Sequence, residues 1–116
     1  MIKRYSTPDM AEIWSDQNKY QKWLDVEIAV CEAWAVEGVV PKKSLNIIKR
    51  KAKFNVKKIE KIEKIVKHDV IAFTTNLSEY IGPESRYIHL GLTSSDVLDT
   101  AFSLQIKESG LLILKD

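Results

Sequence analysis

The sequence has few of the features that mark a membrane, disulfide-rich or low-complexity protein. It contains one cysteine in 116 residues, which excludes an internal disulfide framework and a cysteine-cluster metal site. Its apolar runs are only a few residues long, whereas a membrane-spanning helix needs about 20. With four glycines and three prolines, the chain has few residues that interrupt helices. We therefore expect a soluble, mostly helical protein of the cytoplasm.

The charges are unevenly distributed along the chain. Residues 1–41 carry 4 basic and 7 acidic side chains, residues 42–67 carry 11 and 2, and residues 68–116 carry 3 and 7. The basic segment 42–67 could attract an anion or a nucleic acid. A solvated helical face is the simpler interpretation, because Phe54 is the only aromatic residue and Arg50 the only arginine among these lysines.

Capping residues and apolar spacing divide the chain into helices. Thr7 before Pro8 is a helix start, and Gly38 is a helix end. Asp69 is the expected N-cap of a later helix, and residues 86–91 are expected to be extended. The predicted helices, with their capping residues, are 7–14, 15–38, 44–53, 55–66, 69–82 and 95–116. The last helix is still apolar at 111–114, which predicts that it continues beyond this sequence.

The second predicted helix carries an apolar stripe with one exception. Its stripe has helical spacing throughout and consists of Tyr20, Trp23, Leu24, Ile28, Cys31, Trp34 and Ala35. Glu27 is the exception, because it places a carboxylate on the same face. Cys31 lies on the stripe without a basic neighbour, so we expect a buried structural thiol and not a nucleophile.

Polar side chains collect at the breaks between helices. Arg4 and Tyr5 could hold a phosphate, or could only anchor the start of the chain. His68 beside Asp69 suits proton transfer near neutral pH, while the alternative is a surface histidine next to a capping aspartate. His89 stands between apolar residues, where a buried, hydrogen-bonded histidine is the default.

The segment Gly91-Leu92-Thr93-Ser94-Ser95-Asp96 precedes the last predicted helix. Its hydroxyls and the free N–H groups of a helix N-terminus could bind a carboxylate. The alternative is an ordinary capping motif. The segment lacks the glycine spacing of a P-loop, and nothing in the chain forms a nucleophile triad.

Two strings of sequence are distinctive. Residues 67–73 read Lys-His-Asp-Val-Ile-Ala-Phe, and residues 89–101 read His-Leu-Gly-Leu-Thr-Ser-Ser-Asp-Val-Leu-Asp-Thr-Ala. Together with Arg4-Tyr5-Ser6, Met10, Ile13-Trp14 and the segments 23–27 and 31–34, they resemble the N-terminal part of the adenylosuccinate lyase family. This family belongs to the fumarase/aspartase superfamily, and the resemblance covers essentially the whole chain.

The resemblance implies an all-α fold with two parts. Residues 1–92 would form the N-terminal helical lyase domain, and residues 93–116 would begin the first long helix of a central bundle. The family forms homotetramers whose active sites lie where three subunits meet. Further acid–base residues come from segments absent from these 116 residues, so we expect the chain alone to be a fragment without activity.

The resemblance also implies a reaction and its residues. The family eliminates fumarate from adenylosuccinate, giving AMP, and from SAICAR, giving AICAR, without a metal or organic cofactor. His68 would be catalytic, near the leaving nitrogen. The implied substrate-binding residues are Arg4 and Tyr5 (phosphate and ribose), Lys67 (where the family often has arginine), Asp69 (purine), His89 (phosphate), and Thr93 and Ser94 (succinyl carboxylate).

Two other functions compete with this one. One is a sister lyase of the superfamily that releases fumarate from argininosuccinate or a related substrate. The other is a helical nucleic-acid-binding module that uses the basic segment 42–67. We expect a small nucleotide as the partner, with neither nucleic acid nor a membrane involved.

Overall fold

The computed structural model describes residues 8–115, so Arg4, Tyr5 and the predicted N-cap Thr7 lie outside the described residues. Within this range the chain has no strand, which confirms the predicted all-α fold. The elements are α1 (Pro8–Ile13), α2 (Asp16–Val36), α3 (Lys42–Lys51), α4 (Val56–Val66), α5 (Asp69–Ile81), the 3₁₀ helix η2 (Gly82–Tyr87) and α6 (Ser94–Lys115).

The longest interior helix, α2, follows the predicted pattern. Ser15 caps it by accepting a hydrogen bond from the Asn18 N–H at 3.2 Å, and Gly38 follows its end with a φ of 78°. Its buried residues are Tyr20, Trp23, Leu24, Val26, Glu27 and Cys31. The predicted stripe is therefore the face that enters the core, and the buried position predicted for Cys31 is confirmed.

Aromatic rings hold α2 against α5 and the segment before α4. The Tyr20 ring stacks on the Phe73 ring with centroids 5.8 Å apart and planes 8° from parallel. Trp23 meets Phe73 edge-on at 5.5 Å, and Phe54 lies 6.1 Å from Phe73. Each fully buried side chain of this size stabilises the fold by roughly 1.5–3 kcal/mol. This cluster is the centre of the core.

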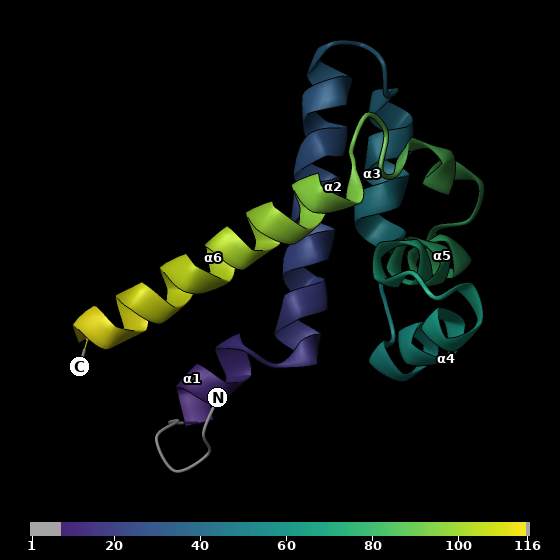
Figure 1. Cartoon of the computed structure of the whole chain (residues 1–116). Helices are drawn as coiled ribbons and strands as arrows, with labels where there is room; N and C mark the ends of the chain where they lie inside the picture. Colours follow the sequence, from purple (N-terminus) through teal and green to yellow (C-terminus); the bar gives the residue numbers. More distant parts are fainter. Residues whose placement is uncertain (1–7, 116) are drawn as a thin grey trace.

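Helix α6 crosses α2 and then leads away from α3, α4 and α5, on the side of the molecule where α1 lies (Figure 1). Val97 and Ala101 near its start are fully buried, and farther along Phe102 lies 5.7 Å from the Trp14 ring beside α1. Beyond that contact, Leu111 and Leu114 are exposed. The radius of gyration is 15.4 Å, above the roughly 13 Å of a compact domain of this length. In the described range, no helix meets the length and apolarity required to span a bilayer.

Three local predictions are wrong. Residues 86–91 are not extended, because η2 continues through Tyr87 and a turn with positive φ at His89 and Gly91 follows it. His68, not Asp69, is the N-cap of α5. Helix α3 begins at Lys42 and not at Ser44, with Pro41 as its N-cap.

Candidate functional site

The junction between α4 and α5 places His68 at a helix start. Lys67 ends α4 in the left-handed conformation, with a φ of 55°, and its N–H donates to the Glu63 carbonyl at 2.7 Å. A left-handed residue other than glycine costs roughly 1–2 kcal/mol. The chain then turns sharply, and His68 takes up the extended conformation of an N-cap. Two helices therefore meet within two residues and expose the histidine between them.

The cap bond determines which nitrogen of His68 can act on a ligand. Nδ1 accepts the N–H of Ile71 at 3.2 Å, so a neutral ring carries its proton on Nε2. The Asp69 carboxylate lies 3.9 Å from the same Nδ1, and an ion pair there would need a proton on that nitrogen. The cap is the shorter contact, and Asp69 already accepts the Val70 N–H at 2.8 Å, so we favour the cap. The Nε2 edge of His68 remains available to a ligand.

The start of α6 is a reciprocal capping box. The Thr93 N–H donates to the Asp96 carboxylate at 2.9 Å, and the Asp96 N–H donates to the Thr93 hydroxyl at 3.2 Å. The capping interpretation of this segment is thus confirmed. The box uses the Thr93 N–H, so an anion at this helix start would depend on the remaining N–H groups and on the hydroxyls, including that of Thr93, whose oxygen accepts the Asp96 N–H while its proton can still be donated.

The two helix starts face each other. The Ser94 hydroxyl oxygen lies 3.5 Å from His68 Nε2, although 26 residues separate them along the chain. The structure thereby brings His68 next to Ser94, with Lys67, Asp69 and Thr93 as their neighbours in sequence. We call these five residues the His68–Ser94 site. Its donors are a ring N–H, a hydroxyl and the end of a helix, which together suit an anionic ligand.

His89 is held separately from this site. Its backbone N–H and its Nδ1 both contact the Glu27 carboxylate, each at 2.7 Å. Its side chain is 26% exposed, so the predicted buried position is only partly correct. No hydrogen bond or ion pair between described residues connects His89 to the His68–Ser94 site. Glu27 is the residue that the sequence prediction missed, and its carboxylate on an apolar stripe was the available signal.

Trp34 fixes the turn that follows His89. Its indole N–H donates to the Leu90 carbonyl at 2.9 Å. A Cβ added to Gly91 would lie 3.1 Å from the Trp34 ring, and the Gly91 φ is 75°. Glycine is therefore needed at residue 91 both for its backbone conformation and for the close approach of the ring.

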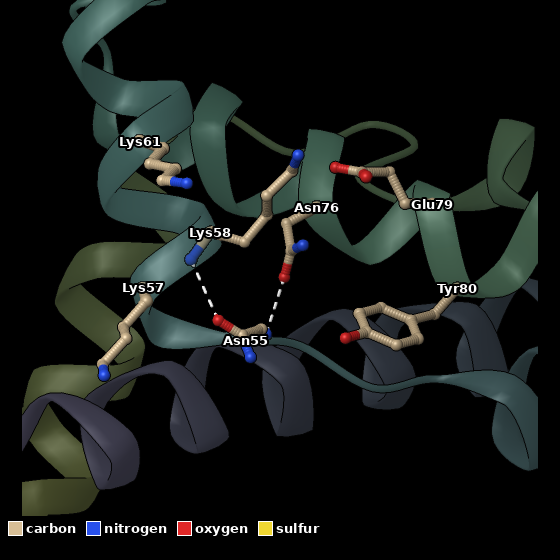
Figure 2. A pocket seen from close by; sticks show the side chains of 7 residues that line it. All are labelled: Asn55, Lys57, Lys58, Lys61, Asn76, Glu79 and Tyr80. Atoms are coloured by element: carbon tan, nitrogen blue, oxygen red, sulfur yellow. Dashed lines mark hydrogen bonds between the residues drawn. The ribbon is translucent and has the colours of Figure 1, made fainter.

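The basic segment lines a cavity elsewhere. A space of about 510 Å³ between α4 and α5 is lined by Asn55, Lys57, Lys58, Lys61, Asn76, Glu79 and Tyr80 (Figure 2). Its amides already have structural partners: Asn55 accepts the Lys58 N–H at 2.9 Å, and the Asn55 N–H donates to Asn76 at 2.8 Å. No residue of the His68–Ser94 site lines this cavity. The cavity lies where α4 packs against α5, and its positive charges come from Lys57, Lys58 and Lys61.

Among residues 8–115, no group of three histidine, cysteine or acidic side chains has the arrangement of a metal site. The chemistry available to the His68–Ser94 site is proton donation and anion binding.

Comparison with known proteins identifies the family. The profile of the family described as "Lyase" matches residues 3–116. The chain belongs to this lyase family. It is 58% identical over 115 residues to adenylosuccinate lyase of Synechocystis sp., covering 99% of this chain and 27% of that protein. It is also 49% identical over 116 residues to adenylosuccinate lyase of Bacillus subtilis, covering 100% of this chain and 27% of that protein.

Solved structures of the lyase superfamily share the fold. A fumarate lyase from Mesorhizobium sp. BNC1 superposes with a TM-score of 0.81 at 28% identity, covering 90% of this chain and 25% of that one. The 3-carboxy-cis,cis-muconate lactonizing enzyme from Pseudomonas putida gives 0.85 at 30% identity, covering 94% and 26%. The chain thus spans about a quarter of the length of the relatives it matches.

Proposed function

We propose that this chain is the N-terminal portion of an adenylosuccinate lyase. The intact enzyme would eliminate fumarate from adenylosuccinate and from SAICAR in purine biosynthesis. The observation that carries the proposal is the 49–58% identity to adenylosuccinate lyases across the whole chain. The intact enzyme would be a cytoplasmic homotetramer, and the 116-residue chain alone would be inactive because other segments supply part of the site.

The geometry of His68 supports a role as proton donor. In the elimination, a base takes the proton next to a carboxylate, the C–N bond breaks as the C=C bond forms, and an acid protonates the departing nitrogen. With Nδ1 occupied by the Ile71 N–H, a neutral His68 presents Nε2–H. That edge is a donor, so His68 suits the acid or a group that holds the leaving side of the substrate.

The start of α6 supports the binding of a succinyl carboxylate. The Ser94 hydroxyl lies beside His68 Nε2, and the first N–H groups of a 22-residue helix favour a negative charge. The Asp96 carboxylate at the same helix start would repel the substrate carboxylate, so hydrogen bonds from the Thr93 and Ser94 hydroxyls must contribute to binding. We assign Thr93 and Ser94 to this carboxylate.

The remaining substrate contacts are proposed from the family resemblance. Lys67 and Asp69 would contact the nucleotide beside His68, and His89 would contact its phosphate. Arg4 and Tyr5, outside the described residues, would contact the phosphate and ribose. No metal or organic cofactor takes part in the proposed reaction.

A spectrophotometric assay of the full-length protein tests the proposal. We expect fumarate to form from adenylosuccinate and from SAICAR, and none to form from argininosuccinate. Activity on argininosuccinate alone would assign the protein to a sister lyase. Absence of fumarate from all three substrates would refute the proposed function.

The nucleic-acid alternative has less support. Single-strand binding proteins stack bases on exposed aromatic rings. Phe54, the only aromatic residue of the basic segment, packs against Tyr20 and Phe73 in the core. Tyr80 is the only aromatic ring that lines the cavity with Lys57, Lys58 and Lys61, so these lysines have one exposed ring beside them and not a row of stacking platforms. We propose a small nucleotide as the ligand.

A further inference from the structure

One face of α2 holds the loop that follows η2. The Cys31 thiol donates to the Tyr87 carbonyl at 3.4 Å, and the Trp34 indole donates to the Leu90 carbonyl at 2.9 Å. His89 lies between Tyr87 and Leu90 in the loop, and the Glu27 carboxylate contacts both its backbone N–H and its ring Nδ1. Positions 27, 31 and 34 have the i, i+4, i+7 spacing of a single helix face. The loop is thus fixed at nearly every residue from 87 to 90.

Glu27 directs both of its oxygens at His89. Oε1 accepts the backbone N–H and Oε2 contacts Nδ1, each at 2.7 Å. The side chain is 0% exposed, and no described lysine or arginine forms an ion pair with it. A carboxylate in the core is very costly unless it is paired and hydrogen-bonded. Burial raises the Glu27 pKa above its ordinary value, and the bonds from His89 offset only part of this rise. His89 is therefore the reason that this carboxylate is tolerated.

His89 keeps only one nitrogen for a ligand. Nδ1 is occupied by Glu27, and no described residue hydrogen-bonds Nε2, while the side chain remains 26% exposed. The backbone lies in the left-handed region, with a φ of 63°, which is uncommon for residues other than glycine, and the Glu27 carboxylate accepts its N–H there. The contact between the buried Glu27 carboxylate and Nδ1 thus sets the direction of the His89 ring.

We infer that Glu27 is a positioning residue, which occupies Nδ1 of His89 and so presents Nε2 to the phosphate of the substrate. The inference rests on the proposed function, because that function supplies the phosphate. The pair would bind phosphate in the form that holds two protons: one lies between Oε2 and Nδ1, and the other is on Nε2 and donates to a phosphate oxygen. A pair with its single proton on Nδ1 would present an acceptor at Nε2 instead.

Kinetics of Glu27 variants in the full-length protein test this role. Glu27→Met removes both acceptors with little change in size, and we expect the KM for adenylosuccinate to rise about tenfold, with a smaller change in kcat. Glu27→Gln keeps an acceptor for the His89 N–H and should raise the KM less. Glu32→Gln is the matched control, because Glu32 is exposed on the same helix and should leave the KM unchanged.

A double-mutant cycle separates positioning from a merely structural role. If Glu27 acts through His89, adding Glu27→Met to His89→Gln should raise the KM no further than His89→Gln alone. The inference would be overturned if the KM increases of the two single variants multiplied in the double variant, or if Glu27→Met had the wild-type KM. If Glu27→Met does not fold, Glu27→Gln takes its place in the same cycle.

Binding of inorganic phosphate by calorimetry provides a readout that needs no turnover. We expect Glu27→Gln and Glu27→Met to weaken phosphate binding severalfold or more, and Glu32→Gln to leave it unchanged. Equal phosphate affinity in wild type and both Glu27 variants would overturn the inference. Wild-type protein that binds phosphate but forms no fumarate would instead refute the proposed function.

Discussion

His68 Nε2 and the Ser94 hydroxyl lie 3.5 Å apart, at the starts of two different helices. His68 is at once the cap of α5 and the ring that faces the start of α6. The two nitrogens of this side chain thus have separate contacts: Nδ1 caps the helix, and Nε2, which faces Ser94, is the nitrogen that we propose for the chemistry. Substitutions can separate these tasks.

Asparagine and alanine at residue 68 should differ in stability but not in activity. Asparagine is among the best N-caps, whereas an alanine cap costs about 1 kcal/mol. We expect His68→Asn to unfold close to wild type, and His68→Ala to lose about 1 kcal/mol in urea denaturation. Both should lower the kcat of the full-length enzyme by roughly 10²–10⁴, the usual contribution of an acid–base group. Wild-type kcat in His68→Asn would remove His68 from the chemistry.

Thr93→Ala should weaken both α6 and substrate binding. It removes the hydroxyl that accepts the Asp96 N–H, at a cost of about 1 kcal/mol in the free energy of unfolding. The same hydroxyl is assigned to the succinyl carboxylate, so the KM should rise as well. Thr93→Ser, which keeps the oxygen, is the control and should restore both values. A loss of stability without any change in KM would leave Thr93 as a cap only.

Alanine should have opposite effects at Gly91 and Gly110. At Gly91 the added Cβ meets the Trp34 ring at 3.1 Å in a left-handed backbone, and we expect a loss of about 1–3 kcal/mol. At Gly110, inside α6, a Cβ meets nothing within 4 Å, and alanine should stabilise the helix by about 0.5–1 kcal/mol. Thermal unfolding of the two variants measures the contrast. Similar melting temperatures would show that the turn tolerates a side chain.

The Cys31 thiol should make stability fall at alkaline pH. Burial raises its pKa from 9.0 to about 11, so below pH 9 the folded state holds about a hundredfold less thiolate than the unfolded chain. Its contribution to stability is fully present below pH 9 and is lost as the pH rises towards 11. The difference in unfolding free energy between wild type and Cys31→Ala should therefore narrow over this window. The folded protein should also react slowly with thiol reagents at pH 8.

Local patterns were sufficient to predict most of the helices. Each of the five longer helices ended within a few residues of its predicted bounds, since caps and apolar spacing act over neighbouring turns. The error at residue 68 is instructive, because histidine is a rare cap and Asp69 next to it is a common one. Only the geometry of the turn after the left-handed Lys67 decides between them.

Pairings between distant residues could not be predicted in this way. Glu27 and His89 are 62 residues apart, and the sequence showed only that a carboxylate interrupted an apolar stripe. Residues 86–91 were expected to be extended because no helical repeat fits so short a segment. Their turns are imposed by bonds from Cys31, Glu27 and Trp34, which exist only after α2 and the loop have met.

The attachment of this loop to α2 also determines how it can move. Releasing residues 87–90 would break the bonds from Glu27, Cys31 and Trp34, which lie on the same face of α2 that contributes Tyr20 and Trp23 to the aromatic core. Local opening here therefore requires much of the energy of global unfolding, so the His89 amide should be among the slowest to exchange with solvent. Residues 87–90 would then keep the same conformation with and without ligand, and any conformational change on binding would occur in other segments of the site.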